Sequence, residues 1–392
     1  MKTIDNFNFK GKKALIRVDF NVPVNENFEV TDVTRIEAAK PTISKILNDG
    51  GSAILMTHFG RPKGKDDKYS LSHIVKKVSE VLGVPVHFAA DCIGEVAEKA
   101  AKELKAGEVL LLENVRFYPE EEKGNEEFAG KLAKLGDIYV NDAFGTAHRA
   151  HASNVGIAEN IGNGNSAVGF LVEKELKFIG EAVNNPKRPL IAILGGAKVS
   201  DKIGVIENLL IKADKILIGG AMMFTFLKAE GKNVGTSLVE DDKLDLAKDL
   251  LAKSNGKIVL PIDTVVASEF KNDAEYSTVD VDSIPNDKMG LDIGEKTVTL
   301  FDSYIKTAKT VVWNGPMGVF EMSNFAKGTI GVCESIASLT DAVTIIGGGD
   351  SAAAAISLGY ADKFTHISTG GGASLEFLEG KILPGVEAIS NK

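Results

Sequence analysis

Arginine is the residue type whose placement points most directly to chemistry in this chain. Only six of the 45 lysine and arginine residues are arginines, and all lie in the first half: Arg17, Arg35, Arg61, Arg116, Arg149 and Arg188. The planar guanidinium group suits bidentate contacts with carboxylates and phosphates, whereas lysine runs through the whole chain as a general surface cation. Because arginine is rare and confined to the first half of the chain, its distribution favours functional roles for these residues over compositional chance.

Three of these arginines follow apolar, strand-like runs. Arg61 comes after AILMTHFG, Arg116 after VLLLENV and Arg149 after DIYVNDAFGTAH. An open α/β sheet binds its ligands beyond the carboxyl ends of its strands, so these three positions predict an anion site. Arg17 lies inside its run, ALIRVDF, and is predicted to serve packing or an ion pair, while Arg188 is interpreted as a connector residue.

Polar residues near the same strand ends extend this prediction. Asp19 and Asn21, in RVDFNVP, alternate along the end of a predicted strand, so they would share one face and could hold a substrate hydroxyl. His58 ends a strand beside Arg61, and we expect His58 and Arg149 to belong to one anion pocket. The alternative is that this histidine is structural.

The second half of the chain repeats one local pattern, a strand followed by glycines and the start of a helix. It occurs in IAILGGAK, KILIGGAM, VTIIGGGD and THISTGGG. Exposed amides at a helix start, together with the helix dipole, bind anions, and glycine lets the backbone approach a phosphate closely. Several such joints in one half of the chain predict a site for nucleotide-type phosphates.

Lys198 and Lys202 are expected to open the helix that follows the first of these joints. Their four-residue spacing would place both side chains on one helical face. A solvated helix face is the usual role of lysines, but cations are disfavoured at a helix N-terminus unless an anion is bound. We therefore predict phosphate contacts for both residues.

Other polar residues follow later strands of this half. Asp350 comes after three glycines and is interpreted as a helix N-cap, as a carboxylate that binds magnesium beside phosphates, or as the metal ligand with Ser351 supplying the cap. Asn314 and Glu321 lie in VVWNGPMGVFE, a predicted loop, where Glu321 could accept hydrogen bonds from a ribose. Both residues could instead satisfy backbone groups of the loop.

Composition and missing motifs exclude several classes of protein. A net charge of −9 disfavours a nucleic-acid-binding surface, and no uncharged apolar run approaches the length of a membrane span. The chain has no Walker A, HExxH, CxxC or nucleophile-elbow sequence. Cys92 and Cys333 lack metal-type spacing and are predicted to be buried thiols in a reduced, cytosolic compartment. His148 and His151 also lack a metal-ligand pattern and are interpreted as structural.

Strand-like runs alternate with amphipathic segments throughout, which predicts an α/β fold with parallel sheets. A length of 392 residues leads us to expect two domains. Residues 35–50 and 70–83 are predicted helices that end in glycine. Residues 167–185, AVGFLVEKELKFIGEAVNN, are predicted to form one long helix that is stopped by prolines and could bridge the domains as a hinge.

The chain resembles the phosphoglycerate kinase family of the bacterial type from about residue 13 to the C-terminal LPGVEAI. Eight ordered motifs carry the resemblance: RVDFNVP, HFGRPKG, ENVRF, NDAFGTAHRAHAS, LGGAKVSDKI, WNGPMGVFE, GGGDSAAA and STGGGASLEFLEG. It implies two Rossmann-like, three-layer α/β domains with parallel sheets, joined by a hinge helix. The implied domains are a phosphoglycerate-binding domain at 1–168, a nucleotide-binding domain at 169–378, and a C-terminal segment at 379–392 that packs back on the first.

The same resemblance implies a reaction and its setting. The implied reaction is reversible transfer of a phosphoryl group between ATP and the carboxylate of 3-phosphoglycerate, with Mg²⁺ as cofactor, in glycolysis and gluconeogenesis. The implied protein is a cytoplasmic monomer whose partners are these small molecules, without nucleic acid or membrane.

Positions that match the family motifs imply two sets of site residues. The phosphoglycerate set comprises Asp19, Asn21, Arg35, His58, Arg61, Arg116 and Arg149. The nucleotide set comprises Lys198, Lys202, Gly290, Asn314, Glu321, Gly348, Gly349, Asp350, Ser351 and Gly372, with Asp350 also the implied metal ligand.

Four positions are implied to be catalytic by the same resemblance. Arg35 resembles the arginine nearest the reacting carboxyl group, and Lys198 resembles the lysine on the transferred phosphoryl group. Gly348 and Gly371 resemble glycines of amide turns near the phosphates.

Two other classes of protein would also have paired α/β domains. A nicotinamide-dependent dehydrogenase needs a GxGxxG turn with an acidic residue about 20 positions later, and LGGAKVSDK does not fit this pattern. A hinged solute-binding protein would normally carry an export signal, and MKTIDNFNFKGKK lacks the apolar core of one.

Overall fold

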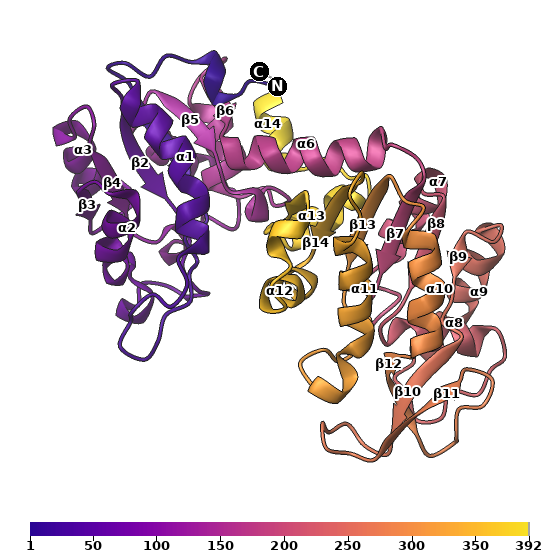
Figure 1. Ribbon diagram of the computed structural model, residues 1–392. Helices are drawn as coiled ribbons and strands as arrows, with labels where there is room; N and C mark the ends of the chain where they lie inside the picture. The colour runs from indigo at the N-terminus through magenta and orange to yellow at the C-terminus, as the bar shows by residue number, and fades with distance from the viewer. Residues whose placement is uncertain (391–392) are drawn as a thin grey trace. The chain divides into compact units, whose positions relative to one another are not determined.

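A computed structural model describes residues 1–390 of the chain. The contacts within the chain divide it into two compact units (Figure 1). Unit 1 contains Met1–Leu176 and residues 382–390, and unit 2 contains Lys177–Lys381. Helix α6 (Phe170–Asn184) belongs partly to each unit. The domain boundaries expected from the sequence fall at 168/169 and 378/379, and residues 391–392 of the expected C-terminal segment lie outside the described residues.

Unit 1 is built on one parallel sheet of six strands in the order β3-β4-β2-β1-β5-β6. The strands are β1 (Lys13–Arg17), β2 (Ser52–Met56), β3 (Val86–Ala89), β4 (Val109–Leu112), β5 (Ile138–Asn141) and β6 (Ser166–Val168). Its helices are α1 (Thr34–Asn48), α2 (Val75–Leu82), α3 (Gly94–Glu103), α4 (Glu126–Ala133), α5 (Ile157–Asn160), the start of α6, and α14 (Pro384–Ser390). Leu15 and Ile16 are neighbours that face opposite sides of β1, and both are fully buried, so both faces of the sheet are covered.

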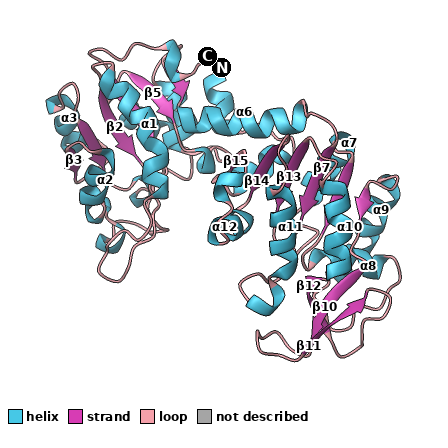
Figure 2. Ribbon diagram, in the orientation of Figure 1, coloured by secondary structure: helices cyan, strands magenta, loops and turns pink. Residues whose placement is uncertain are grey.

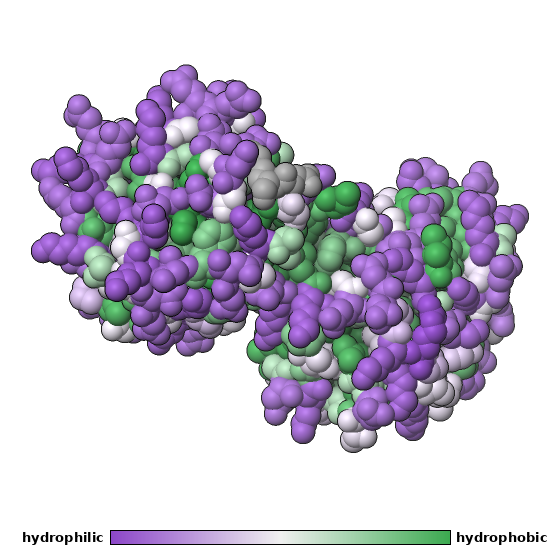
Figure 3. Space-filling model, turned by 90° about the horizontal axis from the view of Figure 1, so that it is seen from above, coloured by the Kyte–Doolittle hydropathy of each residue, from purple (hydrophilic) through white to green (hydrophobic). Residues whose placement is uncertain are grey.

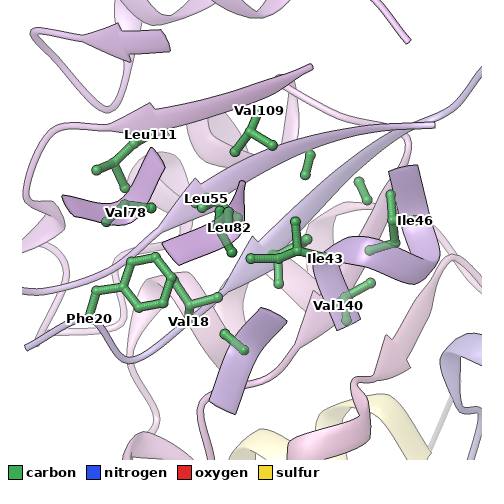
Figure 4. Close-up of a cluster of buried hydrophobic side chains, with 14 of the residues drawn as sticks. Val18, Phe20, Ile43, Ile46, Leu55, Val78, Leu82, Val109, Leu111 and Val140 are labelled. Carbon is green, nitrogen blue, oxygen red and sulfur yellow. The ribbon is translucent and has the colours of Figure 1, made fainter. Parts of the chain in front are cut away.

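One core of unit 1 lies where helices α1 and α2 pack on the sheet (Figure 4). Ile43 of α1 and Val78 of α2 are buried there with Leu55 of β2 and Leu111 of β4. Each such side chain contributes about 1.5–3 kcal/mol when it is fully buried. This packing holds in place the strands whose carboxyl ends carry the candidate site.

The predicted helix over residues 167–185 is wrong at its start. Residues 166–168 instead form β6, paired with β5, and the helix begins at Phe170. Gly169 separates the two elements because its α-carbon packs against Asp142: a Cβ at Gly169 would lie 2.2 Å from Asp142 Oδ1. Close packing against the residue that follows β5 therefore makes the helix start later than its amphipathic periodicity indicates.

Unit 2 is built on a second parallel sheet of six strands, in the order β15-β14-β13-β7-β8-β9. The strands are β7 (Leu190–Leu194), β8 (Lys215–Ile218), β9 (Ile258–Val259), β13 (Thr310–Asn314), β14 (Val343–Gly347) and β15 (His366–Ile367). Its helices are the end of α6, α7 (Ile203–Lys212), α8 (Met222–Ala229), α9 (Leu244–Lys253), α10 (Glu295–Ile305), α11 (Lys327–Ala337), α12 (Gly349–Ser357) and α13 (Gly372–Leu378). Figure 2 shows helices beside the strands of both units, and the predicted α/β fold with two parallel sheets is confirmed.

A third sheet in unit 2 is antiparallel and was not predicted. It has the order β11 (Tyr276–Asp280), β10 (Asp263–Ala267) and β12 (Met289–Ile293). Only residues 268–275 connect β10 to β11, and a parallel crossover needs a dozen or more residues. The short connection therefore forces an antiparallel pair.

The C-terminal helix α14 packs within unit 1 on β6. Its Gly385 N–H donates to Ala147 O at 2.8 Å, and Asn141 Nδ2 lies 3.4 Å from Gly385 O.

Figure 3 shows hydrophilic residues over much of the surface visible in that view, with smaller apolar areas between them. Among residues 1–390, no helix has the length and apolar character needed to cross a membrane.

Candidate active site

The loops after four strands of unit 1 bring the predicted phosphoglycerate set to one edge of the sheet. The order of the strands reverses between β1 and β5, since β2 lies on one side of β1 and β5 on the other. Ligands of open α/β sheets bind beyond the carboxyl ends of the strands at such a reversal. The arginines and their polar neighbours follow β1, β2, β4 and β5, apart from Arg35, which lies in the first turn of α1.

Arg35 is held by the loop that follows β1. Its NH1 lies 3.0 Å from Asp19 Oδ1 and 3.0 Å from Asn21 O, so it donates to both. The prediction that Asp19 and Asn21 alternate along a strand is wrong, because β1 ends at Arg17. Asn21 N–H instead donates to Asp19 Oδ1 at 3.2 Å, a local side-chain bond that favours a turn over a strand.

Gly60, the residue before Arg61, is fixed from two sides. Its N–H donates to Asn21 Oδ1 at 2.8 Å, and its carbonyl oxygen accepts from Arg116 NH1 at 3.1 Å. Gly60 has a φ of +63°, and a Cβ there would lie 2.4 Å from the ring of Tyr69, so glycine is required. The loops after β1 and β4 therefore both contact the loop after β2 at Gly60, next to Arg61, whose side chain is exposed.

His58 lies among cations as a neutral imidazole. Burial and the guanidinium groups of Arg17, Arg116 and Arg35 lower the pKa of His58 to about 2. Arg17 NH2 lies 3.3 Å from His58 Nδ1, and an arginine can only donate, so Nδ1 accepts and Nε2 carries the hydrogen. Arg17 is buried and also donates to Ser153 Oγ at 2.8 Å, in line with its predicted structural role.

The loop after β5 adds Arg149 and two histidines to this edge. Arg149 is exposed, and its Nε lies 3.3 Å from His148 Nε2. Burial, then Arg17, Arg116 and Arg149, lower the pKa of His151 to about 4. The positive charges of the arginines at this edge repel one another. This edge of unit 1 is therefore suited to an anion that carries more than one charge.

In unit 2 the strand order reverses between β7 and β13, and two adjacent cavities lie at the carboxyl ends of these strands. One has a volume of about 580 Å³ and the other about 420 Å³. Four residues line both cavities: Gly196, Ala197, Pro316 and Asp350. The two cavities therefore adjoin, and each contributes a chemically different part of one site.

The smaller cavity is the more polar of the two, and it contains most of the predicted nucleotide set. Its lining includes Lys198, Lys202, Asn314, Gly348, Gly349, Asp350 and Ser351. The Lys202 ammonium donates to Asn314 Oδ1. Burial lowers the pKa of Lys202 below its ordinary value, although Asp201 and Asp350 act in the opposite direction.

The two lysines do not share a helical face, contrary to the prediction. Helix α7 begins at Ile203, so Lys198 lies in the preceding turn and Lys202 is the N-cap. The turn is irregular because Gly196 has a φ of +110° and Lys202 N–H donates to Val199 O at 2.9 Å. Lys198 is exposed within this turn.

Asp350 and Ser351 lie in the first turn of α12, but neither is its N-cap. The N-cap is Gly348, with a φ of +93° and no side-chain bond. Ser351 Oγ instead accepts from Gly315 N–H at 2.6 Å, because that amide is buried and needs an acceptor. The predicted cap role of Ser351 is wrong, and the Asp350 side chain is exposed at the junction of the two cavities.

The larger cavity is apolar, and the sequence predicted only Gly290, Glu321 and the shared Asp350 among the residues that line it. Side chains from several elements line it: Met223, Phe224, Leu238, Phe270, Met289, Leu291, Met317 and Val319. Gly290 lies in β12, where a Cβ would lie 1.9 Å from Phe224 Cζ, so the ring packs on bare backbone. The available signal was the run Met222–Phe224 directly after a glycine joint, and it reads equally well as core.

Gly371 and Gly372 lie at the start of α13, next to β15. Gly371 is the N-cap with a φ of +51°. Neither glycine lines either of the two cavities. Arg188, which was interpreted as a connector residue, also lines neither cavity and forms an ion pair with Asp214 at 3.0 Å.

Comparisons with known proteins agree with this geometry. The family model for phosphoglycerate kinase matches residues 4–381. The chain is 76% identical to the phosphoglycerate kinase of Fusobacterium nucleatum subsp. nucleatum, over 100% of both chains. It is 62% identical to that of Listeria innocua, over 100% of this chain and 99% of the other. The solved phosphoglycerate kinase of Coxiella burnetii has a TM-score of 0.90 and 37% identity, over 99% of this chain and 98% of the other. The chain belongs to the phosphoglycerate kinase family.

Proposed function

We propose that unit 1 binds 3-phosphoglycerate and unit 2 binds ATP or ADP in the reaction of this family. The chain is an ATP-dependent phosphotransferase that moves a phosphoryl group reversibly between ATP and the carboxylate of 3-phosphoglycerate, a step of glycolysis. One observation carries the assignment of the two units. Unit 2 has an apolar cavity continuous with a polar one, as a base and its phosphates require, whereas unit 1 gathers arginines at a strand-order reversal.

The proposed acid site uses side-chain donors. Arg35 would lie nearest the reacting carboxylate, and Asp19 and Asn21 would bind the hydroxyl group. The remaining members would bind the phosphate and carboxylate charges: His58, Arg61, Arg116 and Arg149. The hydrogen on His58 Nε2 supports this role, because the neutral ring keeps one donor for an anion.

The proposed nucleotide site uses backbone amides and lysines. Gly290 and Glu321 would contact the adenosine part from the apolar cavity. The phosphates would lie in the polar cavity beside Lys198, Lys202, Asn314, Gly348, Gly349 and Ser351. Gly371 and Gly372 would supply further amides from the start of α13.

Asp350 is the proposed ligand of Mg²⁺. Its carboxylate is exposed and lines both cavities, and Mg²⁺ is usually bound by one or two carboxylates together with substrate phosphates. The residues present therefore fit the cation. When bound, it would neutralise charge on the nucleotide phosphates.

The chemistry demands positioning more than acid–base catalysis. A carboxylate nucleophile has a pKa of about 4 and is already ionised at neutral pH, so no general base is required. The reacting groups are both anionic, so Arg35 and Lys198 would act mainly by neutralising charge and aligning the transferred group. We further propose that the enzyme acts as a monomer in the cytoplasm, where this reaction takes place in the family.

A coupled assay tests the proposal directly. ADP formation that requires ATP, Mg²⁺ and 3-phosphoglycerate together would support it. Tight binding of another anion without ADP formation would favour a solute-binding protein, and nicotinamide-dependent turnover would favour a dehydrogenase.

A further inference from the structure

One side-chain pair ties the turn that carries Lys198 to a distant segment of unit 2. Ser200 Oγ donates to Glu240 Oε1, and Ser200 N–H donates to Glu240 Oε2 at 3.1 Å. Both oxygens of the carboxylate therefore accept from a single residue. We propose that Ser200 and Glu240 are a positioning pair that holds Lys198 in place for phosphoryl transfer, an inference that rests on the role proposed for Lys198.

Glu240 is itself anchored to the interior of the unit. Its N–H donates to Thr225 Oγ1 at 3.1 Å, and Thr225 is a buried residue of α8. Thr236 and Leu238, a few residues earlier in the same segment, line the apolar cavity. The pair therefore connects the wall of the apolar cavity with the turn at the polar one.

Lys198 depends on this connection because its side chain has no anchor of its own. Within residues 1–390 we find no hydrogen bond or ion pair for its ammonium, which is exposed. The turn is otherwise held by backbone bonds, such as Gly196 N–H to Pro316 O at 3.2 Å. Hydrogen bonds to a carboxylate are roughly twice as strong as neutral ones, so the Ser200 contacts are well suited to define the turn.

Four single variants of the full chain separate positioning from stability. Ser200→Ala removes the hydroxyl and Glu240→Gln removes the charge, and each is expected to lower kcat about tenfold. The dissociation constant for ADP should stay within about twofold in both, because the cavities remain formed. Ser200→Thr keeps both donors and should retain parental kcat. Asp242→Asn is the matched control, since it neutralises an exposed carboxylate nearby that pairs with Lys243 at 3.6 Å.

A second comparison tests whether the pair acts through Lys198. In a Lys198→Ala background, adding Ser200→Ala should cause no further loss of kcat, because the position of a missing side chain no longer matters. Losses that multiply would overturn the inference.

Three other outcomes would distinguish the positioning role from a purely structural one and from a failure of the proposed function. Parental kcat in Ser200→Ala and Glu240→Gln, with only a lower melting temperature, would make the pair a stabilising contact and refute the positioning role. A parent enzyme without ATP- and 3-phosphoglycerate-dependent ADP formation would refute the proposed function, and this inference with it. An active parent with unaffected variants would refute the inference alone.

Discussion

Arg35 NH1 lies 3.0 Å from Asp19 Oδ1, so the arginine at the start of α1 is held against the loop that follows β1. The same nitrogen donates to Asn21 O, whereas Nε and NH2 have no hydrogen-bond partner among the described residues. The Arg35 side chain is 41% exposed. It is therefore oriented by one nitrogen and has free donors for a carboxylate.

Arg35→Ala should lower kcat on the order of 100-fold, with a smaller loss of nucleotide affinity. The reason is that charge neutralisation at the reacting carboxylate is lost while unit 2 is unchanged. Steady-state kinetics and ADP titration would measure the two effects. Arg188→Ala, which removes an ion pair with Asp214 and changes no residue of the proposed sites, serves as control and should be near parental. Near-normal kcat in Arg35→Ala would remove this residue from the chemistry.

Lys198→Ala should reduce turnover more than ATP binding. Its ammonium has no partner among the described residues and lines the polar cavity, so it is available to the transferred group. Comparison of kcat with the ATP dissociation constant checks this. Equal losses in both quantities would identify Lys198 as a simple binding residue.

Asp350→Asn should weaken nucleotide binding only when Mg²⁺ is present. The carboxylate supplies a charged oxygen ligand that the amide cannot replace, so ADP affinity with Mg²⁺ should fall about tenfold. ADP titration with Mg²⁺ and with a chelator separates the contributions. An equal loss under both conditions would assign Asp350 to the phosphates or to the fold.

Asp142→Asn should change how stability depends on pH. Burial raises the pKa of Asp142 to about 7 from an ordinary value of 3.8. Between these values the folded chain keeps a proton that the unfolded chain has lost, so this group lowers the free energy of unfolding as pH rises. The slope is up to about 1.4 kcal/mol per pH unit. The variant cannot ionise and should lose this part of the slope.

Melting temperatures of parent and Asp142→Asn between pH 4 and pH 8 would measure the difference. The two proteins should be closest at the acidic end, with the variant relatively more stable at the alkaline end. A constant difference across this range would contradict the raised pKa.

Local sequence predicted those features that depend on a short run of residues. The buried strand β4 is a continuous apolar run, and Gly83 ends α2 in the left-handed conformation that its position predicts. The arginines Arg116 and Arg149 follow strands, so their gathering at one sheet edge also follows from local pattern and parallel topology.

Tertiary structure decided what depends on contacts between distant residues. Phe224 and Met289 line one cavity only because α8 and β12 are brought together, and each alone has the pattern of an ordinary core residue. Ser351 Oγ accepts a hydrogen bond from Gly315 N–H and does not cap its own helix, because the strand order places β13 beside β14. The sequence by itself determined the two α/β sheets and the chemistry of the residues at their edges. Packing between distant segments determined the shape of the nucleotide cavity and the turn that presents Lys198.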